Sequence, residues 1–210
     1  MLRKLYLSPL GFIISICLNI LSVFKRNFMV YGFRNRVEGK FYKNIRISSS
    51  AILVDKAKMN IQNNVWIGHY CLLDSIGGIY IGEGVNIASH SCIYTHSSHN
   101  AIRVMGKKFI EIPAAERTAY MIEGVEIGAF SFVGTSCVIL PGTSLGRACI
   151  VGAGSVVKGK IPDYSVIAGN PAKIIGDSRD IDRKLFLEGF NFEHYYDASL
   201  RASYTEKKEN

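Results

Sequence analysis

The stretch that decides the fold is residues 127–158, which reads IGAFSFVGTSCVILPGTSLGRACIVGAGSVVK. An aliphatic residue returns every six positions, and the residue four places after it is small in nearly every repeat. The aliphatic positions are Ile127, Val133, Ile139, Leu145, Val151 and Val157, and the small ones are Ser131, Cys137, Thr143, Cys149 and Ser155. A half-buried strand has a period of two and a helix a period of 3.6, so neither explains this pattern. The period instead predicts a solenoid built from six-residue units.

Six residues suffice for one short strand and one turn, so three units make a coil of about 18 residues. The aliphatic residue then points into a three-sided core, and the small residue points inward at a corner. Cys71, Cys137 and Cys149 occupy the small position, so we expect core residues there rather than metal or redox sites. Cys92, one place later, is expected to be structural too. We expect the glycine after the aliphatic residue to supply a turn conformation that a Cβ disfavours.

The repeat also gives the organisation of the chain. The same phase recurs upstream at Ile61, Ile67, Leu73, Ile81, Ile87 and Ile93, with two extra residues near Gly77-Gly78 and a ragged start near Ile47 and Leu53. The register is lost between Ile93 and Ile127. We therefore expect three parts: an N-terminal hydrophobic and basic helical segment (1–46), a coil (47–173) interrupted by an excursion loop (94–124), and a tail (174–210). The tail is expected to hold a short helix and a disordered end after about Ser203.

Positive charge is concentrated near the N-terminus. The formal net charge is +8, but residues 1–46 hold nine basic side chains against the one acid Glu38, and the rest of the chain balances. The charge is therefore local, and neither it nor any motif predicts nucleic-acid binding. The five cysteines show no CxxC pair or zinc spacing, which fits a reducing cytoplasm.

Residues 9–24 predict a helix that begins after Ser8, with Pro9 at its first position. Its length of roughly 24 Å is short of the roughly 30 Å hydrocarbon core of a membrane. Polar residues on one stripe and basic pairs at both ends suit the surface of an anionic membrane, and no signal-peptide cleavage site precedes the second basic pair. Three interpretations stay open: an interfacial helix at the inner face of the membrane, a helix buried against protein, and a true span.

The last repeats resemble a known family. The segments VGAGSVV (151–157), Ile161-Pro162 and AGNPAK (168–173) are similar to the C-terminal signature of hexapeptide-repeat acyltransferases, within them the galactoside, maltose and nodulation-factor O-acetyltransferases. The resemblance covers about residues 61–175. It implies an all-β, left-handed parallel β-helix, a homotrimer with active sites between neighbouring prisms, and acetyl-CoA as co-substrate. Handedness comes from the resemblance alone.

The excursion opens with YTHSSHN (94–100). In the galactoside-type enzymes a matching stretch has two histidines with this spacing, and the first is the general base, which implies that role for His96. A sugar hydroxyl is a poor nucleophile, and a histidine near its unperturbed pKa of about 6.5 can accept the proton as the hydroxyl attacks a thioester. By the same resemblance His99 is a substrate contact or support, and Arg103 matches an arginine that follows the pair.

The resemblance also implies an acceptor and a cofactor site. Asp74 lies near the position of an acidic residue that binds the acceptor sugar in related enzymes. Phe132 lies where many relatives have tryptophan. Phenylalanine retains an aromatic ring at this position but lacks the N–H donor of the indole. The excursion is about a dozen residues longer than in the galactoside enzyme, so the acceptor stays unnamed. The expected cofactor contacts are the backbones of Thr135 and Ala153, nearby Ser155, and the lysines Lys158, Lys160 and Lys173 for the phosphates, with Lys173 the best candidate.

These features together predict an acetyl-CoA-dependent O-acetyltransferase acting on a surface polysaccharide or its lipid-linked precursor. One alternative is an N-acetyltransferase of a nucleotide-linked amino sugar, although the N-terminal α/β domain common in those enzymes has no counterpart in residues 1–46. A non-catalytic scaffold is another. A γ-type carbonic anhydrase needs a third zinc-binding histidine, and none lies between His99 and His194, so we expect no metal.

Overall fold

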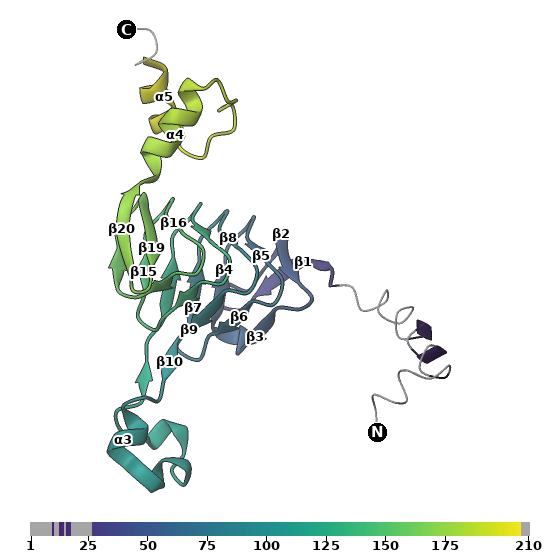
Figure 1. Cartoon of the computed structure of the whole chain (residues 1–210), viewed down its shortest axis with the longest axis vertical. Coiled ribbons are helices and arrows are strands. Elements are labelled where there is room, and N and C mark those ends of the chain that lie inside the picture. The colour runs from purple at the N-terminus through teal and green to yellow at the C-terminus, as the bar shows by residue number, and fades with distance from the viewer. Residues whose placement is uncertain (1–9, 11–12, 15, 18–26, 207–210) are drawn as a thin grey trace.

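The computed structural model describes residues 10, 13–14, 16–17 and 27–206. Most of these residues form a stack of short parallel strands wound into a three-sided coil (Figure 1). A two-stranded stalk with a small helical cap projects from one side of the coil, and two helices stand at its C-terminal end. The expected helix over residues 9–24 lies mostly outside the described residues. Among the described residues, no helix combines the length and the hydropathy that crossing a membrane requires.

Each side of the coil is one sheet, named here A, B and C in the order in which the chain visits them. Sheet A contains β1 (Met29–Asn35), β2 (Lys40–Ser48), β5 (Trp66–Ile67), β8 (Asn86–Ile87), β13 (Phe132–Val133), β16 (Ile150–Val151), β19 (Ser165–Gly169) and β20 (Ala172–Asp177). Sheet B contains β3 (Ile52–Val54), β6 (Leu72–Asp74), β9 (Cys92–Tyr94), β14 (Val138–Ile139) and β17 (Val156–Val157). Sheet C contains β4 (Met59–Ile61), β7 (Ile79–Ile81), β12 (Val125–Ile127), β15 (Ser144–Leu145) and β18 (Lys160–Ile161).

The core follows the six-residue period that the sequence predicts. Aliphatic residues pair from coil to coil, as Ile81 does with Ile127 and Ile127 with Leu145 on sheet C. The equivalent residues of sheets A and B, such as Ile87 and Ile93, are fully buried. Each buried aliphatic side chain contributes about 1.5–3 kcal/mol relative to exposure. The predicted parallel coil is therefore confirmed.

Small residues fill the inner corners because their polar groups reach the backbone there. The Ser131 hydroxyl donates to the carbonyl of Gly146 at 2.9 Å, and the Cys137 thiol points to the carbonyl of Gly152 at 3.1 Å. Cys71, Cys137 and Cys149 are all buried, as expected. Cys92 instead lies half-buried in the outward row of sheet B, where it pairs with Val138.

The reason expected for the repeated glycine is wrong. The left-handed backbone conformation falls three residues after the aliphatic position, at residues such as Phe130, Ser136 and Gly154. The glycine directly after the aliphatic residue is needed for space instead. A Cβ on Gly134 would lie 2.7 Å from the backbone nitrogen of Ala153 in the next coil. Close approach of the coils, and not turn geometry, requires glycine at this position.

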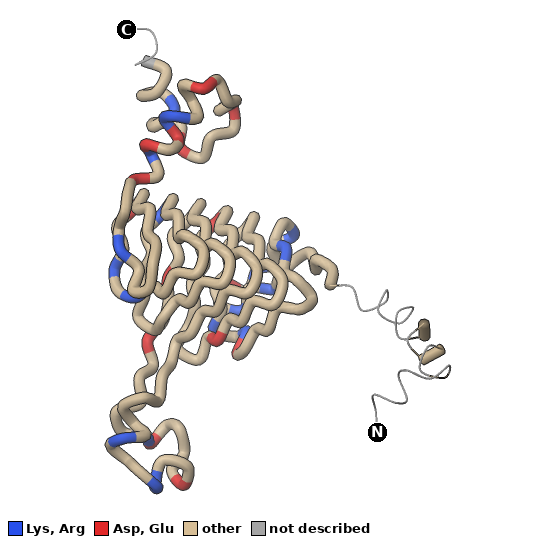
Figure 2. Tube along the Cα trace, viewed as in Figure 1, with Lys and Arg blue, Asp and Glu red and all other residues tan. Residues whose placement is uncertain are grey.

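Residues 29–46 are not helical, which corrects the expectation for the end of the N-terminal segment. β1 and β2 form an antiparallel hairpin, and β2 then pairs in parallel with β5 through Arg46 and Ile47. Alternation explains the strands, because Phe33 and Ile45 are buried while their neighbours are exposed. The hairpin carries several Lys and Arg residues, coloured blue along the tube at the N-terminal end of the coil in Figure 2.

The excursion leaves the coil between β9 and β12. β10 (His96–Ser97) pairs with β11 (Met121–Ile122) in an antiparallel stalk, with His96 opposite Ile122. Beyond the stalk lie α3 (Ala101–Met105) and the 3-10 helices η2 (Gly106–Ile110) and η3 (Ala114–Glu116), and a further 3-10 helix η1 (Lys56–Lys58) precedes β4. The stalk places the predicted base at the junction of coil and excursion.

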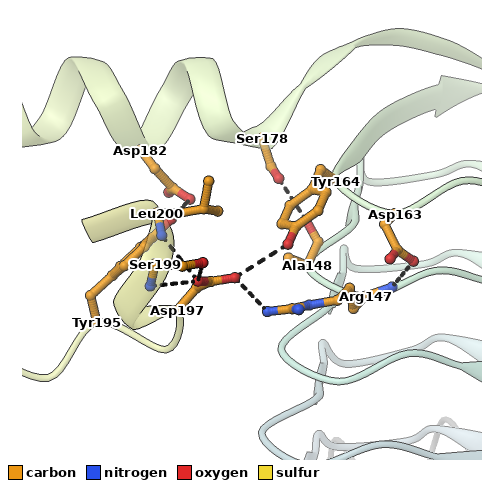
Figure 3. Close-up of polar contacts among 10 residues, drawn as sticks. All are labelled: Arg147, Ala148, Asp163, Tyr164, Ser178, Asp182, Tyr195, Asp197, Ser199 and Leu200. Atoms are coloured by element: carbon orange, nitrogen blue, oxygen red, sulfur yellow. Dashed lines mark hydrogen bonds and ion pairs between the residues drawn. The ribbon is translucent and has the colours of Figure 1, made fainter. Parts of the chain in front are cut away.

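The tail is more ordered than expected. Residues from Ala172 form β20, which returns antiparallel along β19, and α4 (Ser178–Leu187) and α5 (Ala198–Glu206) follow. α5 continues past Ser203 to Glu206, so a disordered end does not begin at Ser203, and residues 207–210 lie outside the described residues. Figure 3 shows how these helices join the coil: Asp197 accepts hydrogen bonds from Arg147 at 2.8 Å and from Tyr164 at 3.3 Å. We call α4, α5 and their connection the C-terminal module.

Candidate active site

A cavity of about 380 Å³ lies where the stalk meets the corner between sheets B and C. Its lining comes from β9, the stalk and the turns that follow β14 and β17. The residues are Tyr94, His96, Ser97, His99, Met121, Leu140, Pro141 and Lys158. Both histidines of the predicted pair therefore face one cavity, together with a lysine from a later coil.

His96 lies beside a carboxylate. Its Nδ1 atom is 3.3 Å from Oδ1 of Asp74, whose side chain is 13% exposed. The Nδ1 atom is buried and has no aligned hydrogen bond, so the contact is an ion-pair distance without good hydrogen-bond geometry. Hydrogen bonds in catalytic sites are often loose before a ligand binds. With Nδ1 turned to the carboxylate, the other ring nitrogen of His96 is the one left for a ligand in the cavity.

Asp74 and His96 meet because of the coil register. Asp74 ends β6 and pairs with Tyr94 at the end of β9, two residues before His96. Thr95 fixes the turn between them, since its hydroxyl donates to the carbonyl of Asp74 at 2.7 Å and accepts from the nitrogen of Gly77 at 2.8 Å. The sequence already held this signal, because aligning Leu73 with Ile93 places Asp74 next to Tyr94.

The other residues expected near the base have structural partners. His99 Nδ1 lies 2.7 Å from the Ser97 hydroxyl. Arg103 is exposed on α3 and donates to the backbone carbonyl of His99 and to the side chain of Asn100. Arg103 thus holds the start of the excursion and is not among the residues that line the cavity.

The expected cofactor residues lie at a different corner. Thr135 and Ala153 are exposed in the turns between sheets A and B, and Phe132, 42% exposed, lies on the outer side of sheet A. His96, Asp74 and Lys158 lie at the corner between sheets B and C. The two groups are on opposite edges of sheet B within one chain. A single chain therefore does not bring the predicted base and the predicted cofactor contacts together.

Ser155 and the lysines are also separated. The Ser155 side chain is fully buried and donates to the carbonyl of Gly152 at 2.6 Å, so it is not available to a cofactor on the surface. Lys158 lines the His96 cavity, Lys160 lies on the outer side of sheet C, and Lys173 lies on β20 opposite Ala168. The three lysines expected at the phosphates do not form one cluster in a single chain.

Within the part of the chain that the structure describes, no three His, Cys, Asp or Glu side chains are grouped closely enough to hold a metal ion. The His96 and Asp74 pair contributes only two such groups.

Part of the chain is similar to known proteins. Residues 124–159 match the family described as bacterial transferase hexapeptide (six repeats). A protein of Escherichia coli (strain K12) named "Putative lipopolysaccharide biosynthesis O-acetyl transferase WbbJ" is 38% identical over 113 residues, which are 54% of this chain and 57% of that protein. This chain therefore spans little more than half the length of that relative.

Two solved structures are similar over a larger share of the chain. The N-acyltransferase AntD from Bacillus cereus, in complex with dTDP and 3-hydroxybutyryl-CoA, has a TM-score of 0.54 and 25% identity, covering 70% of this chain and 86% of its own. A maltose O-acetyltransferase from Clostridium difficile 630 has a TM-score of 0.50 and 26% identity, covering 61% and 64%. Residues 124–159 thus carry hexapeptide repeats, and the chain has the left-handed parallel β-helix fold of these solved acyltransferases.

Proposed function

We propose that this chain transfers an acetyl group from acetyl-CoA to a hydroxyl group of a sugar. The observation that carries the proposal is the His96 imidazole, which faces a cavity while its Nδ1 lies 3.3 Å from the Asp74 carboxylate. The similarity to an O-acetyl transferase of lipopolysaccharide biosynthesis and to a maltose O-acetyltransferase supports the reaction class.

In the proposed reaction His96 acts as general base. It takes the proton of the acceptor hydroxyl as the hydroxyl oxygen attacks the thioester carbonyl. The C–S bond then breaks, and the CoA thiolate takes the proton from the imidazolium. The negative charge of Asp74 favours the imidazolium that forms between these steps. No covalent acyl-enzyme is needed, because both substrates are bound at once.

The decisive experiment measures release of the CoA thiol with acetyl-CoA and a panel of sugars, oligosaccharides and lipid-linked glycans. His96→Ala is expected to lose about a hundredfold or more in kcat, because a positioned base contributes that much. His194→Ala is the matched control, since His194 is an exposed histidine that does not line this cavity. Full activity in His96→Ala would show that His96 is not the general base.

Asp74 has two competing roles that kinetics distinguish. As a positioning residue for His96 it contributes to kcat, so Asp74→Asn should lower kcat and leave KM for the sugar nearly unchanged. As a grip on the acceptor it contributes to binding, and the same substitution should raise KM. The contact with His96 favours the first role, and a raised KM at constant kcat would contradict it.

We further propose that the working form is a homotrimer in which neighbouring prisms share each site. Sheet B presents an outward row of apolar side chains that a neighbour would cover: Ile52, Leu72, Cys92, Val138 and Val156. A neighbour on this side can bring its corner between sheets A and B, with Thr135 and Ala153, to the His96 corner. The pantetheine arm of acetyl-CoA would then run between the two prisms, and Lys173 remains the proposed phosphate contact.

A second acceptor class has support from one comparison. The Bacillus cereus N-acyltransferase AntD matches over 86% of its length, and its complex contains dTDP. A nucleotide-linked amino sugar is therefore the alternative acceptor. Including such amino sugars in the turnover panel separates the two, because an N-acetyltransferase would prefer the amine and an O-acetyltransferase the hydroxyl.

We also propose peripheral contact of residues 1–46 with the inner face of the membrane, where a lipid-linked acceptor would be found. Tyr31 and Phe41 on the hairpin are 69% and 59% exposed. The hairpin cations are Arg34, Arg36, Lys40, Lys43 and Arg46, all exposed, and Glu38 is the only acid among them. Salt-sensitive binding to vesicles containing anionic phosphatidylglycerol, but not to neutral phosphatidylcholine vesicles, is expected. Equal turnover of free and lipid-linked sugars would count against this placement.

A further inference from the structure

The outer side of sheet C holds a groove larger than the His96 cavity. Its volume is about 700 Å³, within the range of small-molecule sites. Five strands contribute one outward side chain each, and these pair from coil to coil in the order Asn60, Tyr80, Glu126, Ser144 and Lys160. Gly77, Gly78, Gly124 and Gly142 form one border, and the Glu123 side chain lies beside Gly142.

We propose that this groove binds an oligosaccharide stretch of the acceptor, so that the preferred substrate is a glycan chain and not a single sugar. This inference rests on the proposed transfer to a sugar hydroxyl. It assigns the chain-binding surface to sheet C, on the other side of the stalk from the reacting atoms.

The chemistry of the groove suits sugars. Tyr80 is the second residue of the row and is 41% exposed, so its ring offers a flat apolar surface on which a sugar ring can stack. Asn60 and Glu126 pair with Tyr80 on either side, at the roughly 4.8 Å spacing of neighbouring strands. An amide and a carboxylate beside an aromatic ring can hydrogen-bond the hydroxyl groups around a stacked sugar.

Two of the polar groups are held in place before any ligand binds. The side-chain oxygen of Asn60 accepts hydrogen bonds from Asn35 at 2.8 Å and from Gln62 at 2.7 Å. The Asn60 side chain also hydrogen-bonds the Glu38 carboxylate, so its amino group is held as well as its oxygen. Lys58 is fixed in the same way, because its Nζ donates to the carbonyl of Ile76 at 2.8 Å. Such preorganisation lowers the entropy cost of binding.

The groove also adjoins the proposed active site. Gly124 and Gly142 border the groove, while Met121 and Pro141, a few residues away in sequence, line the His96 cavity. The nitrogen of Gly77 is hydrogen-bonded to the side chain of Thr95, which directly precedes His96. A glycan lying along sheet C can therefore pass the base of the stalk and present a hydroxyl to His96.

Sheet C is also the side that association should leave open. The outward row of sheet B is wholly apolar, whereas that of sheet A mixes Trp66, Phe132 and Ile150 with Arg46 and Asn86. Apolar rows are the ones that a second copy would cover, because their burial is favourable. The row on sheet C is polar and charged, which favours a hydrated ligand over a protein partner.

The test uses full-length protein and an array of immobilised bacterial surface oligosaccharides with the matching single sugars, without acetyl-CoA. We expect retention of oligosaccharides of three or more units over single sugars. Tyr80→Ala should bind them about tenfold more weakly, whereas Tyr80→Phe, which keeps the ring, should bind as the wild type does. Phe190→Ala is the control for loss of an exposed aromatic side chain elsewhere. Equal binding by Tyr80→Ala and wild type would overturn the inference.

Kinetics separate this inference from the proposed reaction. Tyr80→Ala should raise KM for a long acceptor and leave both kcat and KM for a single sugar unchanged. The His96→Ala variant should lose turnover and keep its retention on the array. If Tyr80→Ala turns over long acceptors and single sugars with the same KM values as the wild type, glycan binding in the groove is refuted and the proposed transfer reaction is not. If the protein is retained on the array but turns over no acceptor, the proposed transfer reaction is refuted and glycan binding in the groove is not. Glu126→Gln supplies a second variant should Tyr80→Ala fold poorly.

Discussion

At the scale of single residues, the inner corners of the coil decide which thiols can react. Burial raises the pKa of the Cys71, Cys137 and Cys149 thiols, which lowers the thiolate fraction at any pH near neutrality. Cys17, by contrast, is exposed. Chemistry at the three buried sulfurs is therefore limited by both access and ionisation.

Thiol labelling with an aromatic disulfide reagent at about pH 8 checks this difference. Cys17 is expected to react at once, and Cys71, Cys137 and Cys149 only after denaturant unfolds the coil. Cys17→Ser identifies the fast signal. Reaction of the three buried thiols in native protein at the rate of Cys17 would contradict the placement of these residues.

A second prediction at this scale concerns glycine. Gly134→Ala would place a Cβ 2.7 Å from backbone atoms of the next coil, which cannot move away without separating the coils. Gly154→Ala meets no atom within 4 Å, and its backbone φ of +71° is its only obstacle. We expect Gly134→Ala to lower the free energy of unfolding by about 3 kcal/mol and Gly154→Ala by about 1 kcal/mol. Denaturant titration measures both, and equal losses would contradict the spacing argument.

At the scale of elements, the C-terminal module depends on one carboxylate. Asp197 caps α5, because its side chain accepts hydrogen bonds from the nitrogens of Ser199 at 3.0 Å and Leu200 at 3.1 Å. The hydroxyl of Ser199 also donates to it at 2.6 Å, and Arg147 of the coil lies 2.8 Å away. These interactions lower the pKa of Asp197 to about 2, and the hydrogen bond from the Ser199 hydroxyl has the largest effect. Figure 3 shows this convergence of coil and module on one side chain.

The lowered pKa fixes the pH range over which the module should loosen. A carboxyl group whose pKa falls on folding stabilises the fold above its unfolded pKa of 3.8 and loses that contribution as pH falls through about 2. Protection of the α5 amides against hydrogen exchange, relative to their intrinsic rate at each pH, should therefore fall between about pH 4 and pH 2. At neutral pH Asp197→Ala should cost about 1–2 kcal/mol locally, whereas Asp197→Asn keeps the cap and loses only the ion pair. Unchanged exchange of α5 in Asp197→Ala would contradict the proposed link.

Some elements of the fold are predictable from the sequence and others are not. The coil is predictable from sequence because every aliphatic position has the same environment, so a pattern of six repeats from Ile127 to Val157 leaves one solution. The hairpin of β1 and β2 is not, because its few alternating residues, such as Phe33 and Ile45, follow a long apolar run that favours a helix. α5 is missed since its stability comes from Asp197 and distant Arg147, which no local pattern connects.

The candidate site divides in the same way. His96 is predictable because the repeat breaks beside it, and the contact with Asp74 follows from the offset of 20 residues between Leu73 and Ile93. The burial of Ser155 is also predictable from the sequence, since Ser155 occupies the small-residue position of the repeat, which points inward. The separation of Lys158, Lys160 and Lys173 is not predictable from the sequence, because it depends on the side of the coil to which each strand belongs.

At the scale of the whole molecule, the proposed site needs two copies of the chain. His96 belongs to one edge of sheet B, and Thr135 and Ala153 to the other. If neighbouring prisms share the site, two variants that are each inactive can complement one another. This is a property that a site within one chain cannot have.

Co-expression of His96→Ala with Ala153→Trp, on differently tagged chains, tests the shared site. Each variant alone should be inactive, while mixed trimers should regain about a third of the wild-type activity, because only one of their three junctions joins an intact base from one copy to an intact corner of the next. Sedimentation of the mixed complexes verifies that trimers form. Mixed trimers without activity would place the whole site within one chain.

Sheet A has a reversed strand at each end, β1 before the first coil and β20 after the last. A stack of parallel coils is otherwise open-ended, because every edge repeats the same row of donors and acceptors and could template another molecule. The reversed strands no longer match an incoming coil, and α4 and α5 stand over the C-terminal rim (Figure 1). Both ends of sheet A are thus closed against fibre growth along the coil axis, which leaves the sides of the coil for the trimer proposed above.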